Sequence, residues 1–348
     1  MRNLSFFNKV IFIFNSILSI ILIIGFILPY IAPKKVPILS VLTLGLPILL
    51  ILNLLFLIYW GIQLKKQIWL SFIFFIIGLP FLKLLYKVSD TVIEPETSDV
   101  VILSYNVHLF NKFDWMPDTD VTADIKTFIN EVNPDIICLQ EFTPVKKTLF
   151  PDYKYKHIVT KGKNIESGLA IFSKFPITNK GNLDFSNTYN NAIYADINIK
   201  GKKIRVYTIH LESLGIASDI NSEIEMIDEN KYRKVFKKVQ KAFIDQQEQA
   251  ESILQHRDNL EIPVIICGDM NNSAFSYAYN TIRGGLNDAF VEAGKGFGKS
   301  YDFKLFPFRI DYILTDPTFQ IKAFTTHDTL KKSDHFPVSA RFKIQNED

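Results

Sequence analysis

The sequence predicts a layered α/β domain that follows a helical membrane region. The first ninety residues contain three long uncharged runs, all rich in Leu, Ile and Phe. After residue 99, short runs of β-branched and aromatic residues recur between polar, Gly or Pro residues. Helical patterns lie between some of these runs. Mixed strands and helices over such a length are typical of a layered α/β (α+β) domain.

The N-terminal region, residues 1–88, is expected to cross a membrane about three times. Its apolar runs cover Val10–Ala32, Val36–Leu64 and Gln67–Leu82, and the first two reach the roughly 20 residues that a spanning helix needs. The third run extends to Tyr86 if Lys83 reaches the lipid headgroups. A cleaved signal peptide is the alternative for the first run. No small-residue cleavage site stands out, however, and further apolar segments follow.

The orientation of this region depends on the third run. With three spans and the N-terminus inside, four basic residues fall on each side, so the positive-inside rule gives no preference. The third run has apolar residues on all sides, whereas a helix lying on the surface shows a wide polar face. We therefore expect an integral membrane protein whose main domain lies outside the cytoplasm, which is the periplasm in a Gram-negative cell. A third segment that only lies on the surface would place the domain in the cytoplasm.

A polar linker, residues 89–99, separates this region from the main domain, residues 100–348. Of the 39 Lys and Arg residues, eight lie in residues 1–90 with one of the 36 acids, so the rest holds 31 basic and 35 acidic residues, or about −4. Proteins that hold nucleic acid through their overall field carry a basic excess. The main domain has none, which disfavours tight non-specific DNA binding without excluding DNA cleavage.

The two cysteines, Cys138 and Cys267, each lie inside an apolar run. We predict two buried thiols that act as small hydrophobic residues. A disulfide framework or a zinc site would need more Cys or His residues at short spacing.

The main domain contains a series of strand patterns and two helical ones. The helical patterns cover Thr122–Val132 and Glu229–Gln255. The predicted strands are Val100–Tyr105, Ile136–Leu139, Leu169–Ser173, Ala192–Ile199, Lys203–Ile209, Val264–Cys267, Ile310–Leu314 and Val338–Ile344.

Polar side chains that can bind a metal ion or transfer a proton stand repeatedly at the ends of these strands. A single Asn or Asp there is usually a turn former. Repeated occurrence in one chain indicates a site built on loops of a rigid scaffold. The residues concerned are Asn106, Glu141, His210, Asp269, Asn271, Asp311, Asp334 and His335, with Arg309 just before one strand.

These residue types indicate metal-assisted chemistry. Carboxylates and carboxamides without Cys suit a hard cation such as Mg²⁺ or Mn²⁺. Two histidines add a proton carrier near neutral pH and a positive charge for developing anions. Together these groups fit the hydrolysis of a phosphate ester.

The motifs LSYNV, LQE, SGLAIFSKFPI, TIHLES, CGDMN, RIDYIL and SDHFPV occur in this order between Val100 and Lys343. In this order they resemble the endonuclease/exonuclease/phosphatase superfamily, which has the deoxyribonuclease-I-like fold. The resemblance implies a four-layer sandwich of two packed mixed β-sheets flanked by helices, with the active site at one edge. It also implies a divalent metal cofactor, Mg²⁺ or Mn²⁺.

The resemblance further implies ligands and water-positioning residues. Glu141 resembles the principal metal ligand, with Asn106 beside it, and Asp334 resembles the second carboxylate on the metal side. Asp269 and Asn271 resemble the pair that orients the attacking water and holds the phosphate.

The same resemblance gives roles to two histidines and their neighbours. His335 resembles the catalytic acid/base. His210 resembles the second histidine of the deoxyribonuclease-like, sphingomyelinase-like and inositol-phosphatase-like branches. Asp311 is expected to orient one histidine and Glu166 the other. Arg309 is either a site residue or part of a structural ion pair near the sheet edge.

Residues 213–260 are longer than a simple crossover requires. They contain apolar residues at helical spacing, and a cluster of basic residues at Lys231–Lys241. Two interpretations remain: a solvated helix face, or a basic surface that rests on anionic headgroups or binds a phosphorylated substrate.

The resulting hypothesis is a membrane-anchored phosphoesterase that acts on a phosphodiester or phosphomonoester. A lipid-derived or small phosphate ester is favoured because the domain is tethered near lipid and lacks a basic excess. The alternatives are a tethered non-specific nuclease and a non-catalytic membrane-bound binding module. Its expected partners are the lipid bilayer and a phosphate-ester substrate, lipid or nucleic acid; no obligate protein partner is indicated.

Overall fold

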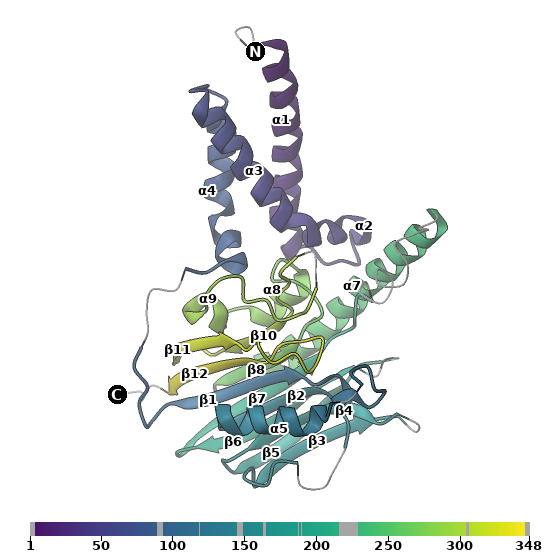
Figure 1. The fold of residues 1–348 in the computed structure, drawn as a ribbon, viewed down its shortest axis with the longest axis vertical. Coiled ribbons are helices and arrows are strands. Elements are labelled where there is room, and N and C mark those ends of the chain that lie inside the picture. The colour runs from purple at the N-terminus through teal and green to yellow at the C-terminus, as the bar shows by residue number, and fades with distance from the viewer. Residues whose placement is uncertain are drawn as a thin grey trace.

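The protein consists of a helical N-terminal region that stands on one end of a layered domain (Figure 1). The computed structural model describes residues 4–88, 93–117, 119–144, 149–162, 165–186, 188, 190–215, 229–303 and 306–344. We call residues 4–88 the helical region and the rest the main domain.

Three helices of the helical region are long and apolar enough to cross a membrane, at Phe6–Tyr30, Pro37–Ile62 and Ile68–Leu85. This agrees with the three predicted runs. The elements are α1 (Phe6–Ile27), η1 (Leu28–Tyr30), α2 (Pro37–Ser40), η2 (Val41–Gly45), α3 (Leu46–Ile62) and α4 (Ile68–Leu85).

Polar side chains join the three helices inside their apolar surroundings. The Nδ2 atom of Asn15 in α1 donates to the Ser71 hydroxyl of α4 at 2.9 Å. The Nδ2 atom of Asn53 in α3 donates to the Ser71 carbonyl at 3.0 Å. Such bonds between apolar helices set which faces meet. The first described turn of α1 lies at the end of the bundle away from the main domain (Figure 1).

The main domain contains two mixed six-stranded sheets. The first has the order β11-β12-β1-β2-β4-β3 and the second the order β5-β6-β7-β8-β10-β9. The strands are β1 (Val100–Asn106), β2 (Ile136–Phe142), β3 (Tyr155–Lys161), β4 (Ser167–Ser173), β5 (Ile177–Asp184), β6 (Asn191–Ile199), β7 (Lys202–His210), β8 (Val264–Asp269), β9 (Asn287–Asp288), β10 (Asp311–Thr315), β11 (Phe319–Thr326) and β12 (Val338–Ile344).

The strands are apolar on both faces. Their inner faces pack against each other, and their outer faces pack against helices. Ile102 and Cys138 of the first sheet meet Ile265 and Cys267 of the second in one buried cluster. Both cysteines are free and buried, as predicted. Alternate residues of the same strands, such as Leu103, point outward and pack under helices.

Helices cover the outer faces and complete four layers. α5 (Val121–Val132) begins at Asp120, whose carboxylate caps the Ala123 N–H, and covers the first sheet. α7 (Glu229–Asp258) and α8 (Tyr277–Arg283) cover the second sheet. The other helices among the described residues are η3 (His108–Asn111) and α9 (Ala289–Ala293). The predicted four-layer fold and both predicted helices are therefore confirmed.

Candidate active site

Strand register brings three of the predicted side chains into one row of the second sheet. β7 and β8 are parallel, and His210 pairs with Asp269. β8 and β10 are antiparallel, and Asp269 pairs with Asp311. Residues that are far apart in the chain thus become neighbours at one sheet edge.

Asn106 links this row to the first sheet. It is buried at the end of β1, and its Nδ2 atom donates to Glu141 Oε1 and to Asp269 Oδ2, both at 3.1 Å. Its Oδ1 atom accepts the His108 N–H at 3.1 Å. One amide therefore holds a carboxylate from each sheet.

Glu141 occupies an unusual backbone conformation. Its φ is +49°, in the left-handed region, and the β2–β4 register shifts between Leu139 and Phe142. A non-glycine residue rarely adopts this conformation, and a bulge of this kind redirects a side chain. Here it accompanies a Glu141 carboxylate that is directed at Asn106.

His335 lies between two buried carboxylates. Its Nδ1 atom is 2.9 Å from Asp311 Oδ2, and its Nε2 atom is 3.6 Å from Asp269 Oδ2. Burial alone lowers the pKa of His335, but Asp311 and Asp269 outweigh it and hold that pKa well above its ordinary value. Ser300 fixes Asp311 by accepting its backbone N–H at 3.0 Å.

Asp269 is the most central carboxylate of the row. Burial raises the pKa of Asp269 to about 6, against the opposing effect of the His335 charge. The backbone N–H of Asn271 donates to Asp269 Oδ1 at 2.7 Å. On the other side, His210 Nε2 lies 3.6 Å from Asp269 Oδ2 and 3.9 Å from Glu141 Oε1.

Asp334 lies at the rim with a partner that the sequence interpretation missed. Its Oδ1 atom is 3.2 Å from His108 Nδ1, and the His108 ring stacks on Trp115 at 3.8 Å between centroids. His108 follows Asn106 by two residues, so the rule of polar residues at strand ends would have found it.

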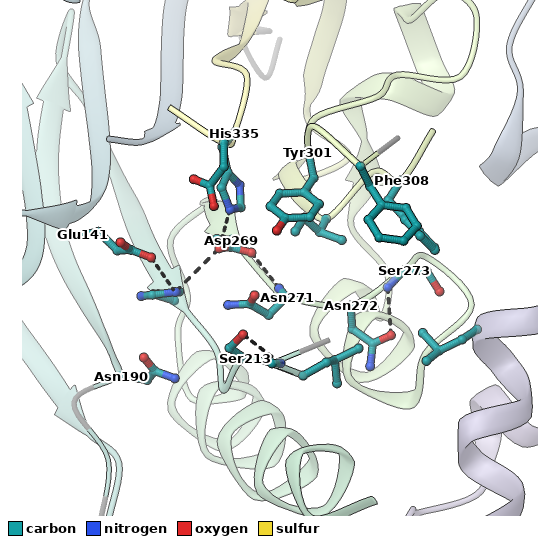
Figure 2. Close-up of a pocket in the computed structure, with 17 residues that line it drawn as sticks. Glu141, Asn190, Ser213, Asp269, Asn271, Asn272, Ser273, Tyr301, Phe308 and His335 are labelled. Atoms are coloured by element: carbon teal, nitrogen blue, oxygen red, sulfur yellow. Dashed lines mark hydrogen bonds and ion pairs between the residues drawn. The ribbon is translucent and has the colours of Figure 1, made fainter. Parts of the chain in front are cut away.

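A pocket of about 390 Å³ is lined by six of these side chains: Glu141, His210, Asp269, Asn271, Asp334 and His335. Figure 2 shows Glu141 and His335 on one side of it and Phe308 on the other. Asn190, Tyr301 and Leu44 also line it. No sequence signal identified Leu44, because it lies within a long apolar run.

A family model described as Endonuclease/Exonuclease/phosphatase family matches residues 103–335, about two thirds of the chain. The chain belongs to the endonuclease/exonuclease/phosphatase family. It is therefore a phosphoesterase of a family of metal-dependent phosphoester hydrolases. Residues 8–85 match a second model, a domain of unknown function (DUF8431). No curated protein sequence matches the chain.

Solved structures share the fold at low sequence identity. The human Nocturnin catalytic domain with bound sulfate is 17% identical. The match covers 72% of this chain and 97% of the Nocturnin chain, with a TM-score of 0.54. D. rerio TDP2 in complex with a single-strand DNA product is 19% identical and covers 71% and 99%, with a TM-score of 0.51. A family protein from Bacteroides thetaiotaomicron is 16% identical and covers 72% and 100%, with a TM-score of 0.52.

The site of this phosphoesterase fits a divalent cation. Asp269, Asp311 and His335 each offer a ligand atom, and these atoms lie within 4.8 Å of one another. Glu141 lies close by through Asn106. Asp311 Oδ1 is buried and has no hydrogen-bond partner among the described residues. Oxygen donors dominate this set, and such a concentration of carboxylates is stabilised by a hard cation.

Two residues singled out from the sequence lie elsewhere. Glu166 is exposed, accepts a hydrogen bond from the Thr160 hydroxyl, and is not among the described residues that line the pocket. Arg309 is buried in an ion pair with Asp288 at 2.8 Å, and its guanidinium lies over the Phe290 ring at 4.4 Å. Arg309 therefore forms a structural ion pair, which was one of the two interpretations that the sequence left open.

Proposed function

We propose that the protein is a membrane-anchored, Mg²⁺-dependent phosphoesterase that hydrolyses a phosphodiester or phosphomonoester, with a lipid-derived or small phosphate ester favoured as substrate. One observation carries the proposal. Site side chains spread from residue 141 to residue 335 line one pocket, and Asn106 and Asp311 contact them from behind, in the combination that metal-assisted hydrolysis requires.

Glu141, Asn106 and Asp334 are proposed to hold the cation, which is Mg²⁺ or Mn²⁺. The neighbouring Asp269, Asp311 and His335 also offer ligand atoms, but they are proposed to act on the water and the leaving group. When bound, it neutralises negative charge on the phosphoryl group. The Asn106 amide keeps Glu141 in place by donating to it at 3.1 Å. The Glu141 backbone conformation further supports a functional position, because strained residues concentrate at active sites.

His335 is the proposed acid/base, and Asp311 its positioning residue. The Asp311 carboxylate accepts the Nδ1–H and leaves Nε2 on the side of Asp269 and the pocket. The two carboxylates favour the charged imidazolium, which can donate a proton to a leaving oxygen or bind a phosphate oxygen.

Asp269 and Asn271 are proposed to orient the attacking water. A carboxylate whose pKa lies near 6 can accept a proton near neutral pH. The Asn271 N–H keeps one carboxylate oxygen directed away from the His335 side. His210, at 3.6 Å from the other oxygen, adds a second positive charge for the phosphate when it is protonated.

A tethered nuclease is the second candidate, and one observation favours it: the similar TDP2 structure holds a single-strand DNA product. The excess of acidic over basic residues after residue 90 favours a substrate other than a long polyanion.

Residues 1–88 are proposed to be the membrane anchor, residues 89–99 the linker and residues 100–348 the catalytic domain, which lies outside the cytoplasm. The arrangement supports this orientation, because three successive helices place the main domain at the end opposite the start of α1. The anchor should keep the protein in membranes through a high-salt wash, and release by salt would contradict it.

The test is a turnover assay of the full-length protein in detergent against lipid, inositol and nucleic-acid phosphates. Mg²⁺-dependent release of phosphate or of an alcohol product supports the proposal. Hydrolysis of DNA alone selects the nuclease, and no metal-dependent hydrolysis of any ester contradicts both.

A further inference from the structure

The pocket has two chemically different ends. Its polar end holds the carboxylates and histidines described above. The rest of its lining is mainly apolar, with the polar Asn272 and Ser273 beside Phe308 (Figure 2). It includes apolar side chains from three separate segments: Leu44, Leu214, Phe303, Phe308 and Ile310. Figure 2 shows the Phe308 and Tyr301 rings on the side of the pocket away from Glu141. At about 390 Å³ the pocket has room for much more than a phosphoryl group, so an apolar substituent matches the remainder.

One wall of the apolar end comes from the helical region itself. Leu44 lies in η2, near the start of the second candidate span, Pro37–Ile62. It packs with Val41 on a buried cluster that includes Leu214 and Phe243 of the main domain. The anchor therefore contributes to the substrate pocket as well as holding the protein near lipid.

Specific contacts hold the helical region against the main domain. The Lys34 N–H donates to Gln247 Oε1 at 2.9 Å, and its ammonium lies 2.6 Å from Glu248. The buried Arg309 donates to the carbonyl of Leu84, near the end of α4, at 3.2 Å. These contacts place the Leu44 wall at the end of the proposed anchor that meets the main domain.

The molecular surface beside this wall is apolar and basic. Ile38 and Leu39 of α2 are 67% and 45% exposed, and α2 packs against α7. On α7, Tyr232 and Phe236 are 59% and 41% exposed, and Lys234 between them is exposed as well. Exposed aromatic side chains with basic neighbours are typical of surfaces that rest on anionic lipid headgroups.

We propose that the substrate is a phospholipid-like phosphate ester that enters from the bilayer, with its hydrocarbon chain against Leu44 and Phe308 and its phosphate at the carboxylate–histidine end. The inference rests on the proposed phosphoesterase function and extends it. Leu44 is thus a specificity-determining residue supplied by the anchor.

The test compares matched substrates that differ only in their hydrocarbon chain, with the full-length protein in detergent micelles. The diester pair is methyl and hexadecyl p-nitrophenyl phosphate. The monoester pair is glycerol phosphate and long-chain lysophosphatidate. A tethered enzyme gains rate from any substrate that partitions into its micelle, so the measured quantity is the long-to-short ratio of kcat/KM in each variant.

Leu44→Gln should lower this ratio about tenfold, because a polar wall loses hydrophobic contact with the chain. Phe308→Ala, on another wall, should lower it as well and provides a second test if one variant folds poorly. Leu64→Gln changes an exposed leucine just beyond the other end of the same candidate span that does not line the pocket, and should leave the ratio at the wild-type value.

Different results would refute the phosphoesterase function and the lipid pocket. If neither member of either pair is hydrolysed with Mg²⁺, the phosphoesterase proposal itself fails. If the short esters are hydrolysed as well as the long ones, or if Leu44→Gln and Leu64→Gln give the same ratio, the hydrolase stands and the lipid pocket is refuted.

Discussion

Replacing Asp311 with asparagine removes the negative charge beside His335 but little volume. The Asp311 carboxylate lies 2.9 Å from His335 Nδ1, and both side chains are almost completely buried. An asparagine oxygen can still accept the Nδ1–H, so the ring orientation can survive. The stabilisation of the imidazolium by a full charge is lost.

The expected loss follows from the strength of this contact. A hydrogen bond to a charged group contributes about 1.5–3 kcal/mol. At about 1.4 kcal/mol per tenfold change in rate, kcat should fall about 10- to 150-fold. The KM should change little, because Asp311 acts through His335 and is not among the described pocket-lining residues. The new amide also places an N–H where Asp311 Oδ1 has no partner among the described residues, which costs about 1–3 kcal/mol of folding stability.

Steady-state kinetics of the full-length protein with an activated phosphate ester measure this prediction, at a temperature where thermal unfolding shows both proteins to be folded. Asp316→Asn is the matched control, since Asp316 follows the other end of the same strand. It should retain wild-type kcat. A folded Asp311→Asn variant with wild-type kcat would refute the role of the Asp311–His335 pair.

Three further predictions concern the rest of the molecule. Arg309→Met leaves the carboxylate of Asp288 buried without its cation, and should lower the free energy of unfolding by about 3–5 kcal/mol; an unchanged melting temperature would contradict the ion pair. Burial alone raises the pKa of Asp196, but the bonds from Arg205 lower it overall, so this pair stabilises the fold above the usual aspartate pKa of about 4 and loses that effect as pH falls further. Asp196→Asn should therefore flatten the acid limb of a stability profile, and a limb identical to wild type would exclude the contribution. A cysteine at the exposed Thr97 should react with an impermeant thiol reagent in cells whose outer membrane alone is permeabilised, because both native cysteines are buried; labelling only after the inner membrane is broken would place the domain in the cytoplasm.

The eight strands predicted from the sequence all form, whereas β3, β5, β9 and β11 were not predicted. Those four strands are the edges of the two sheets. β5 has the sequence ITNKGNLD and is mostly exposed, so it contains no apolar run to detect. Central strands are buried on both faces and therefore read as continuous apolar segments. The difference in detection follows from the position of each strand in its sheet.

The sequence indicated the residues at the polar end of the pocket but not those at the apolar end. Residues such as Asp269 and His335 stand directly beside apolar strands, so their sequence position indicated a common edge. Leu44 and Phe308 carry no such signal, because an apolar residue in an apolar or irregular segment has many possible neighbours. Only the packing of the helical region on the main domain places Leu44 beside the catalytic side chains.

The central claim is metal-dependent hydrolysis at the pocket that contains Glu141. The most direct measurement is turnover of a phosphate ester by full-length wild type, Glu141→Gln and Glu131→Gln, before and after EDTA and with Mg²⁺ restored. Glu131 is an exposed residue of α5 and provides the charge-matched control. The account predicts that EDTA abolishes and Mg²⁺ restores the activity of wild type and Glu131→Gln, while Glu141→Gln stays inactive and folded. Wild-type turnover by Glu141→Gln at saturating Mg²⁺ would contradict it.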